Sequence, residues 1–401
     1  MQKIPFLDLK QLNAPYMDAL KAAAAQVVES GWYIRGSFCE KFEKAFADYC
    51  GVKYAVGVGN GLDGLTLMLR AEIELGRLNA GDEILVPSNT YIATLLAVSA
   101  AGLVPVLVEP CEKSFNMDPA RLDASCGPRT RGILVVHLYG RLADMPAICK
   151  FAKERGLLLF EDCAQAHGAR LSAAAGDPQA CNRPRFAGSF GAAAAYSFYP
   201  TKNLGALGDA GMVVTDDAEI ARVVRMLGNY GSERKYVNEF AGVNSRLDEM
   251  QAALLLQKLP NLDRDNARRR EIAERYLAEV KNPLLVLPEP PADPQEHVWH
   301  VFTLRAGDPR SGTCCRDALQ KYLEARGIGT LIFYPIPPHL QQAYASGYAL
   351  RIGEPALRSS GPLGQPVAES LAMSILSVPL NPALTDAQVS EIIGALNEFV
   401  C

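Results

Sequence analysis

The sequence predicts an α/β fold in which a large domain holds a mainly parallel seven-stranded sheet and a smaller C-terminal domain is α+β. Its 401 residues exceed what a single hydrophobic core usually holds, so about two domains are expected. Up to about residue 244, short and continuously apolar runs alternate with helical patterns. Such runs are typical of parallel strands, which are buried on both faces of a sheet. Beyond this point the alternation stops, which indicates a second domain.

Each predicted strand of the large domain is a short apolar run. The runs occupy 54–58, 84–87, 104–108, 133–138, 157–160, 194–198 and 212–215. Helical patterns are predicted at 37–49, 65–74, 92–101 and 145–155. For the first of these helices, Ser37 and Glu40 form an S-x-x-E pattern that predicts a capping box, and Gly51 is expected to end the helix.

The pattern after residue 244 mixes helices with a single strand. We predict helices at 246–259, 263–280, 315–326 and 386–399, a strand at 298–305 and a proline-rich connector at 287–294. We place the domain boundary so that 1–260 form the large domain and 261–401 the small one. The segment 172–184 is rich in Ala, Gly, Pro and Asn and is expected to be a surface loop.

The composition argues against several kinds of partner. The net charge of −4 argues against nucleic acid and against an anionic membrane surface. No run of about 18 apolar residues is present, so no membrane span is expected. The 10 cysteines lack the spacing of a zinc site, so no metal is expected. Because the N-terminus also lacks a signal peptide pattern, we expect free thiols in a cytoplasmic protein.

Two charged side chains follow predicted strands, at the carboxyl ends where parallel sheets bind their ligands. Asp162 follows the apolar run at 157–160, and ligands gather beyond the carboxyl ends of parallel strands. Taken alone, such an acid is more often the cap of a helix, here one that would begin at Cys163. Lys202 follows the strand at 194–198. Most lysines in turns are solvated, but the apolar flanks favour a lowered pKa and an imine-forming nucleophile.

A third segment predicts an anion site, and a fourth supplies an aromatic ring. Asn60, Gly61 and Leu62 lie between a strand and a helix, where backbone N–H groups attract anions. Their spacing matches neither a Walker loop nor G-x-G-x-x-G, so this pattern alone is weak. Asp63 would repel a phosphate, so its side chain is expected to turn away and cap the helix. Tyr91 fits stacking on a planar ring and ordinary packing equally well.

Together these four segments supply the groups that pyridoxal 5'-phosphate (PLP) requires. They provide a phosphate cradle, a stacking ring, an acid and an amine. In PLP enzymes the acid keeps the pyridine nitrogen protonated, and the lysine holds the aldehyde as an imine and later moves a proton. The sequence therefore predicts PLP as the cofactor, with Lys202 and Asp162 as the catalytic residues.

Several ordered motifs extend along nearly the whole chain. They are SGWYI at 30–34, VGNGLD at 58–63, GDEILVP at 81–87, VHLYG at 136–140, EDCAQAHG at 161–168, SFYPTKNLG at 197–205, NSRLD at 244–248 and IPPH at 336–339. In this order they resemble the sugar aminotransferases of the DegT/DnrJ/EryC1/StrS group. The resemblance implies the aspartate-aminotransferase fold (PLP fold type I).

The resemblance assigns cofactor contacts residue by residue. Lys202 matches the Schiff-base lysine, Asp162 the partner of the pyridinium nitrogen, and Gln165 the group beside the ring hydroxyl. Tyr91 matches the residue that stacks on the ring.

The phosphate contacts come from the same resemblance. They are assigned to the backbone amides of Gly61 and Leu62, next to Asn60, and to Ser197. Asn229 is expected to reach the cofactor phosphate of a partner subunit, which implies a homodimer with shared active sites.

Substrate contacts are assigned to Tyr334 and His339, in the loop that resembles the sugar-nucleotide contact. Phe333 departs from the pattern, because a histidine is common there, and this puts one polar substrate contact in doubt. Ala210 replaces a usual glycine. The segment 172–184 resembles an insertion near the site entrance.

The motifs at 31–34, 60–63 and 331–339 are most similar to those of dTDP-3-keto-6-deoxyhexose 3-aminotransferases. The resemblance therefore implies amination of a nucleotide-linked 3-keto-6-deoxyhexose with L-glutamate as donor. One alternative is a 4-aminotransferase acting on a UDP- or dTDP-4-keto-sugar. PLP sugar dehydratases replace the Schiff-base lysine, and Lys202 argues against them. Another alternative is a non-catalytic sugar-nucleotide sensor, which would not need Lys202, Asp162 and Gln165 together.

Overall fold

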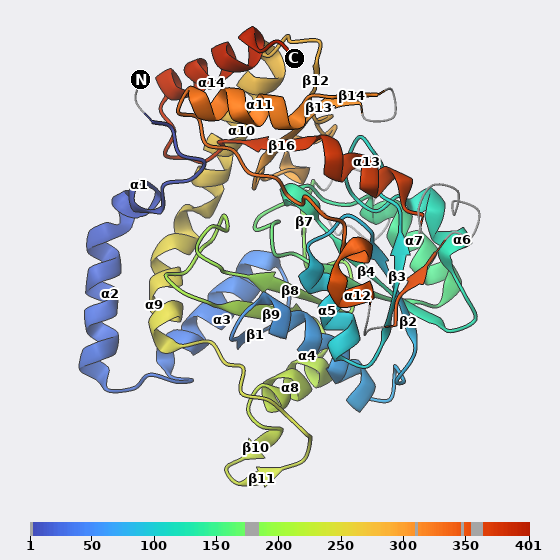
Figure 1. Ribbon diagram of the computed structural model, residues 1–401. Helices are drawn as coiled ribbons and strands as arrows, with labels where there is room; N and C mark the ends of the chain where they lie inside the picture. Colours follow the sequence, from blue (N-terminus) through green and yellow to red (C-terminus); the bar gives the residue numbers. More distant parts are fainter. Residues whose placement is uncertain (1–2, 173–183, 309–311, 346–348, 354–363) are drawn as a thin grey trace.

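The computed structural model describes residues 3–172, 184–308, 312–345, 349–353 and 364–401 (Figure 1). Its elements form an α/β unit around a large central sheet and a smaller α+β unit from the C-terminal part of the chain (Figure 1). The predicted surface loop at 172–184 lies outside the described residues, except for its two end residues.

The central sheet has eight strands, one more than predicted. Seven of them are the predicted apolar runs, with ends shifted by a few residues at most. The eighth, β15, belongs to the C-terminal part and pairs in parallel with β3. The order across the sheet is β1 (Tyr54–Val58), β9 (Gly211–Thr215), β8 (Ala193–Ser197), β5 (Leu158–Asp162), β4 (Thr130–Val136), β2 (Glu83–Pro87), β3 (Val104–Val108) and β15 (Arg351–Ile352).

The sheet is mainly parallel, as predicted. Every pairing from β8 through β5, β4, β2 and β3 to β15 is parallel, whereas β9 runs antiparallel to both β1 and β8. The carboxyl ends of β4, β5 and β8 therefore point to the same edge. The loops that follow these three strands meet there, which is where ligands bind in sheets of this type.

Helices cover both faces of the sheet, which explains why its strands are continuously apolar. One face packs against α3 (Ser37–Cys50), α7 (Met145–Arg155) and α9 (Glu249–Lys258). The other face packs against α4 (Gly61–Glu74), α5 (Ile92–Ala100) and α8 (Ala218–Leu227).

The smaller unit has its own core and its own antiparallel sheet. In that sheet β13 (Phe302–Asp308) pairs with β12 (Leu285–Val286), β14 (Thr313–Cys314) and β16 (Ile375–Val378). Its helices are α10 (Leu262–Glu279), α11 (Arg316–Ala325) and α14 (Asp386–Glu398). Ile4 also lies in this core and bridges Ile328. The N-terminus and β15 thus cross between the two units, and the boundary at 260/261 stays a prediction.

The remaining helices and strands are short or lie at the edges of these units. Apart from several three-residue 3-10 helices, they are α1 (Leu9–Asn13), α2 (Met17–Ser30), α6 (Leu122–Ser125), α12 (Gln342–Ala345), α13 (Pro366–Ser374), β6 (Arg170–Leu171), β7 (Arg185–Phe186), β10 (Ser232–Arg234) and β11 (Val237–Asn238). Within the described ranges, no helix combines the length and the apolar character that crossing a membrane requires.

The N-terminus of α3 is capped by a distant carboxylate, so the predicted capping box is wrong. The N-cap residue is Gly36, and no side chain next to it in sequence accepts a capping bond. Glu249 Oε1 instead accepts hydrogen bonds from the N–H groups of Gly36 and Cys39, both at 2.8 Å, and Oε2 accepts one from Phe38 at 3.0 Å. Burial alone would raise the pKa of Glu249, but these hydrogen bonds lower it.

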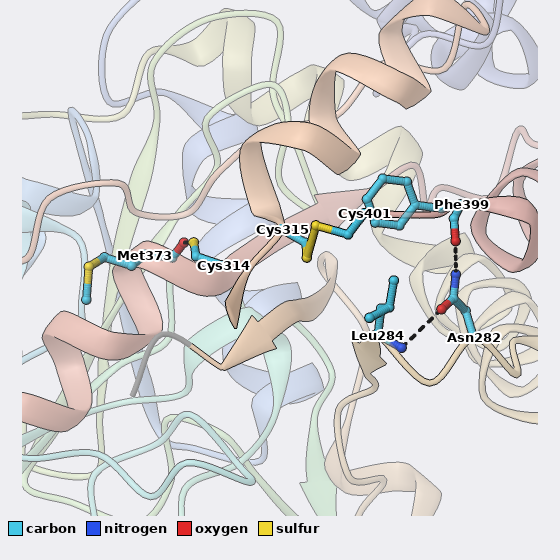
Figure 2. The surroundings of a disulfide bond; sticks show 7 residues. All are labelled: Asn282, Leu284, Cys314, Cys315, Met373, Phe399 and Cys401. Carbon is cyan, nitrogen blue, oxygen red and sulfur yellow. Dashed lines mark hydrogen bonds between the residues drawn. A yellow bond between two sulfur atoms is a disulfide. The ribbon is translucent and has the colours of Figure 1, made fainter. Parts of the chain in front are cut away.

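One disulfide contradicts the expectation of free thiols only. Cys315, at the start of α11, is bonded to Cys401 at the end of the chain (Figure 2), with the two Cα atoms 5.9 Å apart. The Phe399 carbonyl next to it accepts a hydrogen bond of 2.7 Å from Asn282 Nδ2 (Figure 2). The bond therefore fastens the C-terminus to the core of the smaller unit. Six other described cysteines carry free thiols, namely Cys39, Cys50, Cys111, Cys126, Cys163 and Cys314, and Cys181 lies outside the described residues.

Candidate active site

A cavity of ≈ 540 Å³ lies where the loops after β4, β5 and β8 meet. It brings together nine of the eleven side chains or backbone segments predicted from the sequence. These are Asn60, Gly61, Leu62, Tyr91, Asp162, Gln165, Ser197, Lys202 and Tyr334. They come from five separate parts of the chain, so the cavity depends on the fold and not on any local motif.

Lys202 lies in a tight turn just after β8. Its backbone N–H donates to the Tyr199 carbonyl at 2.8 Å, which directs the residue into the cavity lining. Burial lowers the pKa of Lys202 to about 8, although the nearby Asp162 carboxylate acts in the opposite direction. About a tenth of this amine is therefore neutral and nucleophilic at pH 7, far more than for an ordinary lysine.

Asp162 is the last residue of β5, and its two oxygens have different partners. Oδ2 accepts a hydrogen bond from the Thr94 hydroxyl at 2.8 Å, and Oδ1 accepts one from the Ala164 N–H at 3.1 Å. Burial raises the pKa of Asp162, while these two bonds and the charge of Lys202 lower it. No helix begins at Cys163, so the reading of Asp162 as a helix cap is wrong.

The neighbouring carboxylate, Glu161, points to the opposite face of β5, as the alternation of side chains along a strand requires. It accepts hydrogen bonds from the N–H groups of Gly188 and Phe190 at 2.7 and 2.6 Å. It also pairs with His137 Nε2 at 3.0 Å. Because the Ala143 N–H donates to His137 Nδ1, the ring hydrogen lies on Nε2 and is donated to Glu161. Only one of the two adjacent acids faces the cavity.

Gln165 connects two aromatic residues at the cavity wall. Its Oε1 accepts a hydrogen bond of 2.6 Å from the Tyr139 N–H, and its Nε2 donates to the Tyr334 hydroxyl at 3.1 Å. Burial, followed by the charge of Asp162, raises the pKa of Tyr334, which therefore stays a neutral hydroxyl. The Tyr139 hydroxyl donates to the Phe333 carbonyl and so holds the loop that carries Tyr334.

Tyr91 contributes an accessible ring. Its side chain is 55% exposed, and its ring centroid lies 5.1 Å from that of Tyr334. The exposed ring is free to cover a flat group in the cavity, which ordinary core packing would not allow.

The beginning of α4 fits a phosphate group. The Asn60 side chain caps the helix by accepting from the Asp63 N–H at 2.9 Å, and the first backbone bond runs from Gly64 to the Asn60 carbonyl. The N–H groups of Gly61 and Leu62 precede that bond and have no intrahelical acceptor. A Cβ on residue 61 would lie 2.7 Å from Ser197 Cβ, so only glycine leaves this corner open.

Asp63 turns away from this corner, as predicted, but does not cap the helix. Its Oδ2 accepts a hydrogen bond of 2.6 Å from the Ser245 hydroxyl. The capping role belongs to Asn60. The anion expected beside Gly61 therefore meets no local negative charge from Asp63.

Two predicted residues do not line the cavity of their own chain. Asn229 lies after α8, where its Oδ1 accepts from Arg246 Nη1 at 2.9 Å and its Nδ2 donates to the Ser232 hydroxyl at 3.2 Å. His339 is buried, and its Nε2 lies 3.0 Å from Glu369 Oε1. Burial lowers the pKa of His339, and Glu369 acts in the opposite direction.

Two residues that orient the predicted ones, Thr94 and Tyr139, were not predicted from the sequence. Thr94 bonds to Asp162 and also lies 3.0 Å from the Thr90 hydroxyl. Thr94 lies three positions after Tyr91 in a predicted helix. Because its hydroxyl is about one helical turn from a predicted site residue, Thr94 could have been predicted as a second residue of the site. Tyr139 belongs to the motif at 136–140, but nothing in that motif shows that its N–H meets Gln165.

The chain is similar to known aminotransferases along nearly its whole length. The DegT/DnrJ/EryC1/StrS aminotransferase family matches residues 17–397. A dTDP-3-amino-3,6-dideoxy-alpha-D-galactopyranose transaminase of Aneurinibacillus thermoaerophilus is 46% identical over 396 residues, which cover 99% of each chain.

Solved structures of similar proteins have the same fold. The chain is similar to DesV of S. venezuelae, crystallised in complex with a ketimine intermediate, with a TM-score of 0.87, 45% identity and coverage of 99% of this chain and 98% of that one. It is also similar to ntda from Bacillus subtilis with bound cofactor PMP, with a TM-score of 0.83, 28% identity and coverage of 99% and 85%. The chain belongs to the DegT/DnrJ/EryC1/StrS aminotransferase family and is an aminotransferase of PLP fold type I.

Proposed function

We propose that this enzyme uses PLP to transfer the amino group of L-glutamate to C3 of a dTDP-linked 3-keto-6-deoxyhexose. The observation that carries the proposal is the cavity itself, which is lined by Lys202, Asp162 and Gln165 together with the open start of α4. A sensor that only binds a sugar nucleotide would need neither a lysine with a lowered pKa nor a buried acid beside it.

The residues present fit the cofactor. The N–H groups of Gly61 and Leu62, with the Ser197 hydroxyl, would hold the phosphate at the positive end of α4. Tyr91 would cover the ring, and Asp162 would hold the protonated pyridine nitrogen. The bound group supplies an electron sink that the protein lacks.

The chain's own residues then supply orientation and proton movement. Thr94 and the Ala164 N–H fix the Asp162 carboxylate, which stabilises a positive charge at a neighbouring nitrogen. Lys202 Nζ, with its pKa of about 8, can accept and release a proton close to neutral pH. Gln165 donates to the Tyr334 hydroxyl, and the two side chains form one wall of the cavity that orients a bound group.

The substrate assignment rests on the relatives. The transaminase of A. thermoaerophilus is named for a dTDP-linked 3-amino sugar and covers almost the whole of this chain. Tyr334 lines the cavity and so can contact a sugar bound there. His339 would act through the loop that carries both residues, because its own side chain is buried against Glu369.

Amination at C4 of a UDP- or dTDP-4-keto-sugar is the competing reaction. To decide between them, the enzyme is incubated with PLP, L-glutamate and a panel of 3-keto and 4-keto nucleotide sugars. NMR of the product is expected to place the new amine at C3. An amine at C4 would overturn the regiochemistry and leave the enzyme class intact.

A homodimer with shared sites is part of this proposal. Asn229 lies outside the cavity of its own chain, half-buried beside Arg246, where it could serve the cavity of a second copy. Among the described residues that line the cavity, Lys202 is the one cation, and it is assigned to the aldehyde of the cofactor, so a donor from a partner would complete the phosphate contacts.

A further inference from the structure

Lys258, the last residue of α9, is a buried lysine outside the cavity. Only 7% of it is exposed, and its Nζ donates to the Gly205 carbonyl at 2.5 Å and to Asn13 Oδ1 at 3.0 Å. Burial lowers the pKa of Lys258 to about 8, with the charge of Asp265 opposing. Lysines are rarely buried this deeply, because removing an ammonium group from water is unfavourable.

The carbonyl that Lys258 binds belongs to the turn that carries Lys202. This turn is closed by a bond from the Ala206 N–H to the Phe198 carbonyl, 2.8 Å long. A Cβ on Gly205 would lie 2.4 Å from the Pro200 carbonyl oxygen, so the two arms of the turn touch. The turn is therefore compact, and a shift at Gly205 would move Lys202 as well.

A second anchor holds the same turn from another direction. Asn203 Nδ2 donates to Asn266 Oδ1 at 2.8 Å and to the Val298 carbonyl at 3.0 Å. Asn203 Oδ1 lies 3.1 Å from His300 Nδ1. Asn203 thus fixes the middle of the turn, whereas Lys258 fixes its C-terminal arm.

We propose that Lys258 is a positioning residue: its ammonium group holds the Gly205 carbonyl, and through it the turn, in the place that directs Lys202 into the cavity. The contact with Asn13 ties this turn to α1, so the N-terminal helix shares in the placement. The inference rests on the proposed role of Lys202 as the residue that bonds to the cofactor.

The test separates the placement of Lys202 from the binding of the cofactor phosphate and ring. Full-length wild type, Lys258→Met and Lys150→Met are freed of cofactor. Lys150 is exposed on α7, so its variant is a control for loss of one lysine. Each protein is mixed with pyridoxal phosphate, sampled over time into borohydride and mapped by mass spectrometry. Binding of pyridoxamine phosphate, which has no aldehyde, is measured in parallel.

We expect Lys258→Met to trap label at Lys202 about tenfold more slowly than wild type, because small misplacements of a reacting group have large effects on rate. Its affinity for pyridoxamine phosphate should match that of wild type, since the cradle and the ring contacts are unchanged. Lys150→Met should match wild type in both measurements. Trapping of Lys202 in Lys258→Met at the wild-type rate overturns the proposal. A parallel loss of the trapping rate and of the affinity for pyridoxamine phosphate also overturns it, because Lys258 would then be a general structural residue.

A second variant covers the case in which Lys258→Met does not fold. In Lys258→Gln the amide nitrogen ends one bond short of the ammonium position, so it cannot reach both acceptors. We expect trapping about threefold slower than wild type with unchanged affinity for pyridoxamine phosphate. A wild-type trapping rate here also overturns the proposal. If wild type itself carries the label on a lysine other than Lys202, the proposed role of Lys202 fails independently of Lys258.

Discussion

At the scale of single residues, Asp162 offers the most direct test of the chemistry. Asp162→Asn preserves the size of the side chain but cannot hold a positive charge at the pyridine nitrogen. We expect the activation free energy to rise by on the order of 3 kcal/mol, which lowers turnover about a hundredfold. The fold and some PLP binding should persist. Steady-state transamination, circular dichroism and bound PLP measure the three quantities.

The adjacent acid provides a matched control for this prediction. Glu161→Gln disturbs a buried network with His137 and Gly188 but leaves the cavity side of β5 unchanged. It should lower the melting temperature and leave turnover per folded molecule within a few-fold of wild type. Near-normal turnover in Asp162→Asn would instead show that this carboxylate is structural.

The same two residues show what could be predicted from the sequence. Asp162 and Lys202 follow strongly apolar runs, and the geometry of a parallel sheet brings such strand ends to one edge. Thr94 and Tyr139 could not be found in this way, because their contacts depend on which loop lies next to which. His339 was predicted by resemblance, but its side chain turns inward to Glu369, and no sequence pattern reports that direction.

At the scale of the helix, Glu249 replaces the predicted local cap of α3. Glu249→Gln has a neutral amide and cannot accept three N–H bonds as the carboxylate does. We expect it to lower the free energy of unfolding by about 2 kcal/mol, measured by urea denaturation at pH 7. Ser37→Ala, which removes the hydroxyl of the predicted capping box, is the control and should leave stability unchanged. A larger loss of stability in Ser37→Ala than in Glu249→Gln would restore the local cap.

The pH dependence of this difference follows from the lowered pKa of Glu249. A carboxyl group with a folded pKa below its unfolded value, about 4.3 for glutamate, stabilises the fold above that value. The stabilisation is lost as the pH falls through the folded pKa. The gap between wild type and Glu249→Gln should therefore be full at pH 7 and shrink at acidic pH.

The disulfide at the C-terminus gives a second prediction at this scale. It closes a loop with a sequence separation of 86, for which the chain-entropy estimate is about 4.6 kcal/mol. Cys401→Ser should lower the melting temperature under non-reducing conditions (Figure 2). Cys314→Ser, which removes the free neighbour of Cys315, is the control. Adding a reductant should lower the melting temperature of wild type to that of Cys401→Ser. Equal melting temperatures of the two proteins without reductant would show that the bond does not form in solution.

Local helices and strands were predictable because their patterns lie within the element itself. The seven strands follow from short apolar runs, and five of the six helices that cover the sheet follow from helical patterns, whereas α8 was not predicted. The cap of α3 and the disulfide were not predictable, since Glu249 and Cys401 lie far along the chain from their partners. The predicted capping box had the right residue types, but it does not form, because the buried carboxylate of Glu249 accepts the three N–H bonds at the start of α3.

At the scale of the whole molecule, the eighth strand shows how the two units are joined. Arg351 and Ile352 add β15 to the edge of the large sheet, beside β3. Arg351 Nη2 also donates to Glu83 Oε2 at 3.1 Å and to the Ser125 carbonyl at 2.6 Å. Two residues carry no periodicity, so this pairing could not be predicted from the sequence. Dividing the chain at 260/261 would therefore remove β15, the edge strand of the large sheet.

The proposed dimer gives the last prediction. If Asn229 of one chain serves the cofactor phosphate of the other, Asn229→Asp should weaken PLP binding, because a carboxylate repels the phosphate and cannot donate to it. Arg246 Nη1 lies 2.9 Å from Asn229 Oδ1 and would offset part of that charge. Asn229→Ala is therefore measured beside it, since alanine removes the donor and adds no charge. Both variants should be inactive at low PLP concentration.

Mixing Asn229→Asp with Lys202→Ala under conditions of subunit exchange then tests whether the site is shared. If Lys202 and Asn229 of one site come from different chains, each hybrid dimer has one site with both defects and one with neither. Random exchange makes about half of the dimers hybrid, so about a quarter of all sites should recover activity in a closed twofold dimer. If both residues of a site came from one chain, every site would stay defective. With exchange confirmed by native mass spectrometry and each variant inactive alone, an absence of recovery rules out the shared site and assigns Asn229 to its local bonds with Arg246 and Ser232.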